Sequence, residues 1–178
     1  MKRNCIVGVG NELMGDDGIG PYVIRKLHEM GVADREEGEG AQDMSIFNDY
    51  LEGVDLPEQQ DEVLVEAIDG GTSMLRAIYV MEGFDEAIVV DAIDFGGVPG
   101  EVVTFDPDEV ESTGTGISMH SFDVIETIKM MIKLDELPVD RIIVVAIQPE
   151  AVCEQDGLSG SVERSYNSVI HSIAGHIR

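Results

Sequence analysis

The chain is poor in basic residues, and this shortage excludes several kinds of partner. Only 11 of its 178 residues are lysine or arginine, against 36 aspartates and glutamates, so the formal net charge is −25. The pI is near 4.1. Because nucleic acids and anionic membranes are polyanions, we exclude both as partners. A basic protein or a cation remains compatible with this charge.

Cysteines and long apolar runs are also scarce. Cys5 and Cys153 are too few and too far apart for a disulfide framework or a thiolate metal site, so we expect both to be reduced. No apolar run reaches the roughly 18–20 residues that a membrane-spanning helix needs. The N-terminal sequence MKRNCIVGVG has neither the apolar length nor the cleavage site of a secretory signal. We therefore expect a cytoplasmic protein.

Length and composition are those of one globular domain, which we assign to residues 1–178. Hydrophobic residues make up 43% of the chain and charged residues 26%. The segment at about 34–62 differs from the rest, because it holds many acids, several glycines and a single arginine, Arg35. We interpret it as an acidic surface insertion.

Short apolar runs alternate with segments of helical periodicity along the chain. Strands are predicted over Asn4–Val9, Val63–Ile68, Ala87–Val90, Val102–Phe105 and Arg141–Ile147. Helices are predicted over Pro21–Met30, Ser73–Val80, His120–Leu134 and Ser161–Ile177. This alternation favours a three-layer α/β/α fold with a twisted, mostly parallel central sheet and one antiparallel edge strand, residues 102–105.

In folds of this class, ligands bind at the carboxyl ends of the parallel strands. That rule directs attention to the loops that follow the predicted strands. These loops are Gly8–Gly20, Asp69–Thr72, Asp91–Gly97 and Gln148–Gly160. We expect the functional side chains to lie on them.

The first of these loops, within VGVGNELMGDDGIG, begins like a phosphate-binding loop but does not complete that pattern. Leu13 stands where the dinucleotide fingerprint G-x-G-x-x-G needs its third glycine. The acid that ends the second strand, Asp69, comes much later than the roughly 20 residues that a ribose-binding acid requires. A phosphate at the start of the following helix would also face Asp16 and Asp17. We therefore disfavour nucleotide binding.

Several acids in these loops have a structural interpretation as well as a functional one. Asp16 or Asp17 can cap the first helix, while the other faces the crevice between the loops. Asp91 ends an apolar strand, where a buried carboxylate is costly unless a cation or loop amides pair with it. Asp69 precedes two glycines, which favours a turn closed by its own side chain.

A histidine completes a possible set of metal ligands. His120 opens a helix, where the helix dipole favours a neutral imidazole, although it could equally be a polar loop residue. The motifs G-x-S-x-G and H-E-x-x-H are both absent. A carboxylate after the first strand, Asp91 and His120 would supply two oxygens and one nitrogen. Such a set suits a borderline divalent ion such as Ni²⁺ or Zn²⁺.

Taken in order, these residues resemble the nickel–iron hydrogenase maturation endopeptidases. The similarity rests on short motifs that run through nearly the whole chain. They are GVGN at 8–11 with Leu13, DDGIG at 16–20, DGGT at 69–72, AIVVDA at 87–92, SMH at 118–120 and QPE at 148–150. The resemblance implies the three-layer fold predicted above and a protease of aspartic type.

The resemblance also implies a substrate and a set of site residues. The family removes the C-terminal extension of the hydrogenase large-subunit precursor after nickel insertion, and uses the substrate-bound nickel as its recognition element. Carried over by motif, Asp17, Asp91 and His120 are both the catalytic and the metal-contacting residues. Asp16 is the alternative if the alignment shifts by one residue. The metal is nickel, carried by the substrate or bound directly, and no organic cofactor is implied.

Two features of the chain depart from the family pattern. Asp17 stands where the family often has glutamate, and the insertion at 34–62 is longer than expected. Together with the acidity, the insertion resembles an archaeal member that serves the deazaflavin-reducing hydrogenase of a methanogen. The alternative function is a non-proteolytic accessory factor that binds nickel or a hydrogenase.

Overall fold

The computed structural model describes residues 2–34, 47, 63–109 and 119–177, with the backbone alone at 109 and over 119–123. Its strands are β1 (Lys2–Val9), β2 (Val63–Gly71), β3 (Glu86–Ala92), β4 (Val102–Phe105) and β5 (Arg141–Ile147). Its α-helices are α1 (Ile19–Glu29), α2 (Met74–Val80), α3 (Met119–Leu134), α4 (Gly160–Arg164) and α5 (Tyr166–His176). Two 3₁₀ helices, η1 (Gly15–Gly18) and η4 (Pro107–Glu109), complete the described elements.

The strands form one sheet in the order β2-β1-β3-β5-β4. The first four of these are mutually parallel, and β4 pairs antiparallel with β5 at the edge, where Val102 lies opposite Ile147. The predicted mostly parallel sheet with one antiparallel edge strand is therefore confirmed. Strands β4 and β5 also have the predicted bounds.

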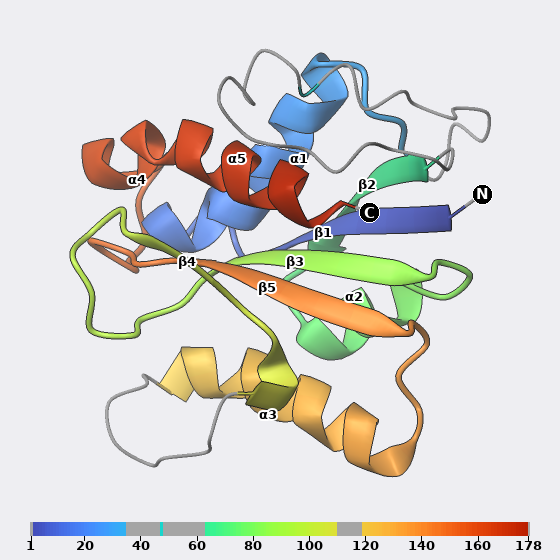
Figure 1. The fold of residues 1–178 in the computed structure, drawn as a ribbon. Helices are drawn as coiled ribbons and strands as arrows, with labels where there is room; N and C mark the ends of the chain where they lie inside the picture. The colour runs from blue at the N-terminus through green and yellow to red at the C-terminus, as the bar shows by residue number, and fades with distance from the viewer. Residues whose placement is uncertain (1, 35–46, 48–62, 110–118, 178) are drawn as a thin grey trace.

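Helices cover both faces of this sheet, as Figure 1 shows. Because side chains alternate along a strand, each strand contributes to two cores. Ile6, Ile88 and Val145 pack with α1, α4 and α5 on one face. Cys5 and Val89 pack with α2 and α3 on the other. These two cores make the predicted three-layer architecture.

The C-terminal helix differs from its prediction, and the structure adds one buried residue within the predicted insertion. The predicted helix over Ser161–Ile177 is divided into α4 and α5, because the Ser165 hydroxyl donates a 2.7 Å hydrogen bond to the carbonyl of Val162. Within the predicted insertion, the structure describes Asp34 and Phe47. Phe47 is fully buried in the α1 and α5 core, so this residue is anchored inside the protein.

The described part of the chain also bears on the predictions for the cysteines and for membrane-spanning helices. Cys5 and Cys153 are both free thiols, as predicted, and Cys5 is buried. No helix among the described residues has the length and apolarity needed to cross a bilayer.

The glycines of the first loop allow α1 to approach β1 closely. A Cβ added to Gly8 would lie 2.4 Å from the carbonyl oxygen of Gly20. A Cβ added to Gly20 would lie 2.2 Å from the carbonyl oxygen of Val9 and 2.7 Å from that of Val90. These neighbours are backbone atoms, which cannot move aside without shifting the sheet.

We therefore expect Gly20→Ala to lower the free energy of unfolding by about 3 kcal/mol or more, because its methyl group would overlap the backbone of two strands. Gly175→Ala is the matched control, since Gly175 has ordinary backbone angles in α5 and open space around its Cβ position. The control should be neutral or stabilising by up to about 1 kcal/mol. Urea unfolding of both variants measures the difference, and equal stabilities would contradict the proposed close approach.

Candidate active site

The loops that follow the parallel strands are joined at the carboxyl edge of the sheet. The amide of Gly10, after β1, donates to the carbonyl of Gly71, at the end of β2, over 3.0 Å. The amide of Gly100, after β3, donates to the carbonyl of Gln148, after β5, over 2.8 Å. The amide of Glu150, after β5, also donates to Asp16 in the segment after β1, so these two pairs of segments are joined as well.

Asp17 lies in η1, the short helix that separates β1 from α1. Its side chain is half-buried, and its Oδ2 accepts a 2.8 Å hydrogen bond from the amide of Asn11. The N-cap of α1 is Gly18, and no side chain caps that helix. The interpretation of Asp16 or Asp17 as the cap is therefore wrong, and a different partner holds each acid.

Asp16 is fully buried, and protein donors surround its carboxylate. Oδ2 accepts from the amides of Glu150 at 2.8 Å and Ala151 at 2.9 Å. The amide of Ser159 donates to Oδ1 at 2.6 Å, and the Ser159 hydroxyl donates to Oδ2 at 2.9 Å. These bonds give Asp16 a structural role, and metal contact by Asp17, with Asp16 as the alternative, stays a prediction.

Asp91 lies at the end of β3, with 6% of its surface exposed. Burial raises the pKa of its carboxyl well above the ordinary value, and the negative charge of Asp17 raises it further. A 2.9 Å hydrogen bond from the amide of Ala92 acts in the opposite direction. The charge of Asp17 therefore reaches Asp91, and the fold brings two of the three predicted site residues together.

His120 belongs to the first turn of α3 by its backbone, as predicted. Its side chain lies outside the part of the chain that the structure describes, so its place beside the two acids stays a prediction. Among the described side chains, no group of three histidines, cysteines or acids is arranged to hold a metal ion. The metal-binding set likewise stays a prediction.

The structure adds Gln148, a site residue to which the sequence analysis assigned no role. Its side chain is 6% exposed, and Oε1 accepts 3.0 Å bonds from the amides of Phe95 and Gly97. Nε2 donates to Oδ1 of Asp94 at 3.0 Å. The sequence signals for this role were its place directly after the apolar strand β5 and its place in the QPE motif at 148–150.

Asp69 forms the predicted turn, because its Oδ1 accepts a 2.7 Å hydrogen bond from the amide of Gly71. The presence of Asp69 at this place is therefore explained by the turn, without a metal or substrate.

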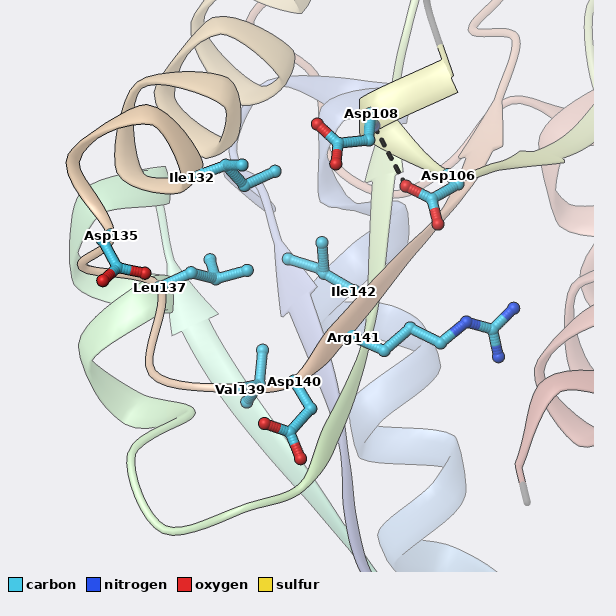
Figure 2. A pocket seen from close by; sticks show the side chains of 9 residues that line it. All are labelled: Asp106, Asp108, Ile132, Asp135, Leu137, Val139, Asp140, Arg141 and Ile142. Atoms are coloured by element: carbon cyan, nitrogen blue, oxygen red, sulfur yellow. Dashed lines mark hydrogen bonds between the residues drawn. The ribbon is translucent and has the colours of Figure 1, made fainter.

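A cavity of about 310 Å³ lies away from these acids, beside the first residues of β5. Figure 2 shows the side chains of Ile132, Leu137 and Ile142 pointing into it, with aspartates around them. Its lining includes Arg141, the first residue of β5, whereas the site loops follow the last residue of that strand. The cavity is therefore separate from the candidate site.

The Asp17–Asp91 pair has the chemistry of a cation site. Two neighbouring carboxylates repel one another, and a buried one loses the water that would solvate its charge. A divalent cation beside both relieves the repulsion and replaces the lost solvation. With an imidazole as third donor, the set suits a borderline ion such as nickel.

We expect Asp91→Asn to raise the stability of the protein at neutral pH, because the buried charge is removed. Between the ordinary pKa of 3.8 and the raised one, the folded state holds a proton that the unfolded chain releases. The free energy of unfolding of the unsubstituted protein therefore falls as pH rises through this window. The midpoint of thermal unfolding should rise by a few degrees at pH 7, since 1 kcal/mol corresponds to roughly 2–4 °C.

The control for net charge is Asp140→Asn, which removes an exposed acid at the other end of β5. Below about pH 3.5 the advantage of Asp91→Asn should vanish, because Asp91 is then protonated in both states. Equal midpoints for the two variants at pH 7 would contradict the buried, repelled carboxylate.

Comparison with known proteins agrees with this fold. The family profile for hydrogenase maturation proteases matches residues 54–176, which includes Asp91 and His120 and begins after Asp17. A protein of Methanocaldococcus jannaschii assigned as a hydrogenase maturation protease is 31% identical over 99% of this chain and 97% of its own. Coenzyme F420 hydrogenase subunit delta of Methanothermobacter thermautotrophicus is 27% identical over 97% and 92%.

A solved structure supports the same relationship at the level of the fold. The [NiFe] hydrogenase maturation protease HybD of Thermococcus kodakarensis superposes with a TM-score of 0.66 at 24% identity, over 99% of both chains. The profile match covers more than half of the chain, and the sequence similarity to the M. jannaschii protein covers nearly all of it. The chain belongs to the hydrogenase maturation protease family.

Proposed function

We propose that this endopeptidase removes the C-terminal extension of a nickel–iron hydrogenase large-subunit precursor after nickel insertion. In this proposal Asp17, Asp91 and His120 contact the nickel that the precursor carries. The observation that supports it is the Asp17–Asp91 pair, in which a buried carboxylate of raised pKa lies near a second acid at the carboxyl edge of the sheet.

Nickel acts here as part of the substrate. It supplies a Lewis acid that can polarise the scissile carbonyl or activate water. The described loops hold two carboxylates able to accept the proton of the attacking water, and the sequence has no serine nucleophile motif. Because the pair attracts a cation, a precursor without nickel leaves the repulsion between the acids unrelieved. Nickel would thereby report completed assembly.

Three exposed apolar residues lie on segments that follow the strands. Leu13, Val98 and Val152 are large apolar residues on the loops after β1, β3 and β5, with exposed fractions of 68%, 72% and 44%. We propose that they contact the precursor tail on either side of the cleaved bond.

The similarity to coenzyme F420 hydrogenase subunit delta supports a deazaflavin-reducing hydrogenase as the particular substrate. The family match to maturation proteases does not favour the alternative of a non-proteolytic accessory factor. We further propose, as the sequence led us to expect, that processing takes place in the cytoplasm and needs no organic cofactor.

We expect the unsubstituted protein to release a short C-terminal peptide from nickel-loaded cognate precursor and to leave nickel-free precursor intact. Asp17→Asn and His120→Ala should each lower the cleavage rate by about 10²-fold or more, because each removes a group that contacts the nickel. Mass spectrometry of the precursor before and after incubation measures both the product and the rate.

Asp69→Asn is the matched control, since Asp69 is an exposed acid at the same end of the sheet. The side-chain amide oxygen of the asparagine can still accept the hydrogen bond from Gly71 that closes the turn. It should cleave at the rate of the unsubstituted protein. No product from a loaded cognate precursor would instead favour the accessory factor. Equal cleavage of nickel-free precursor would contradict the role of nickel.

A further inference from the structure

One loop holds both acid-bearing segments of the site in place. This loop, residues 148–159 and here called the β5 loop, connects β5 to α4. Through Asp16 it is bonded to η1, which carries Asp17, and through Gln148 it is bonded to the loop after Asp91. We propose that Asp16 and Gln148 are positioning residues, which set the separation of Asp17 and Asp91 for cleavage. This inference rests on the proposed function.

Asp16 joins η1 to the β5 loop through four hydrogen bonds to its carboxylate. Three of the donors bond to Oδ2 and one to Oδ1. Three are the amides of Glu150, Ala151 and Ser159, and the fourth is the Ser159 hydroxyl, all between 2.6 and 2.9 Å. Such charge-assisted bonds are stronger than those between neutral groups. Asp16 therefore fastens η1 to the β5 loop at both of its carboxylate oxygens.

The backbone reinforces this attachment on both sides of Asp16. Its amide donates to the carbonyl of Ala151 at 3.1 Å, and that of Gly15 donates to the carbonyl of Gln155 at 3.2 Å. The amide of Gln155 returns a 3.2 Å bond to the carbonyl of Leu13. Because Asp17 is the next residue in η1, the direction of its side chain follows from this fixed backbone.

Gln148 attaches the other end of the β5 loop to the segment after Asp91. Its Oε1 accepts from two amides of that segment, and its Nε2 donates to Asp94. Its own amide donates to the carbonyl of Glu101 at 2.9 Å. The segments that carry the two acids are thus held by one short stretch of chain, although Asp17 and Asp91 are 74 positions apart in the sequence.

This arrangement affects the chemical step because cleavage needs both acids beside the same metal and carbonyl. A misplacement of about 1 Å can lower a reaction rate by about 10²-fold. The precursor also contacts the protein over a wider surface, which substitutions at Asp16 or Gln148 leave in place. Loss of positioning should therefore lower kcat and leave KM nearly unchanged.

The test compares Asp16→Asn and Gln148→Met with Val169→Ala, using nickel-loaded precursor. Asp16→Asn keeps the shape of the side chain but turns an NH₂ group toward amide donors, and Gln148→Met leaves the amides of Phe95 and Gly97 without their acceptor. Both should lower kcat by about 10–100-fold, with KM within about twofold. Val169→Ala removes packing from the fully buried core of α5, outside both the β5 loop and η1. It should lower stability and keep the original kcat.

Thermal unfolding of each variant shows whether it is folded during the assay. Original kcat values in folded Asp16→Asn and Gln148→Met would overturn the inference, as would an equal loss in Val169→Ala. If Asp16→Asn does not fold, Gln148→Met decides the result alone. If the unsubstituted protein leaves loaded precursor uncut, the proposed function fails and this inference fails with it. If only the variants behave unexpectedly, the proposed function stands.

Discussion

The close approach of α1 to β1 is the constraint on which the site depends. Gly8 and Gly20 meet where any side chain would strike backbone, and this contact brings the start of α1 against the ends of β1 and β3. The turn before α1 therefore lies beside Asp91. In a phosphate-binding protein, glycines at this place allow the chain to approach an anion. Here they allow two backbone segments to approach one another, and the acids of η1 make the edge suitable for a cation.

Asp16 and Asp17 show how neighbouring acids acquire opposite roles from their surroundings. Asp16 is enclosed by four donors and has become part of the framework. Asp17 keeps a single described bond, from Asn11, and its charge acts on Asp91. The framework role of Asp16 depends on the β5 loop, more than 130 residues away in sequence. Neither acid is distinguished by its local sequence.

This dependence explains which features were predictable. The alternation of apolar strands and amphipathic helices specifies the layers and the antiparallel edge strand, because burial imposes those periods locally. The position of Asp91 followed from the strand that it ends. The roles of Asp16 and Gln148 depend on hydrogen bonds from loop amides, and the break at Ser165 on a bond from its hydroxyl to the carbonyl of Val162. Such bonds leave no periodic signal. The choice between Asp16 and Asp17 came from resemblance to a family, and the structure adds that donors of the β5 loop surround Asp16.

The burial of Asp91 is unfavourable in the free protein, and this cost is informative about function. A carboxylate that is deprived of water and repelled by Asp17 lowers stability unless a cation or a proton neutralises it. Sites of this kind persist where binding uses the stored repulsion. The β5 loop supplies the opposing force, because its bonds prevent η1 and the end of β3 from moving apart to relieve the strain. A rigid pair of acids that attracts a cation is what recognition of a metal-loaded substrate requires.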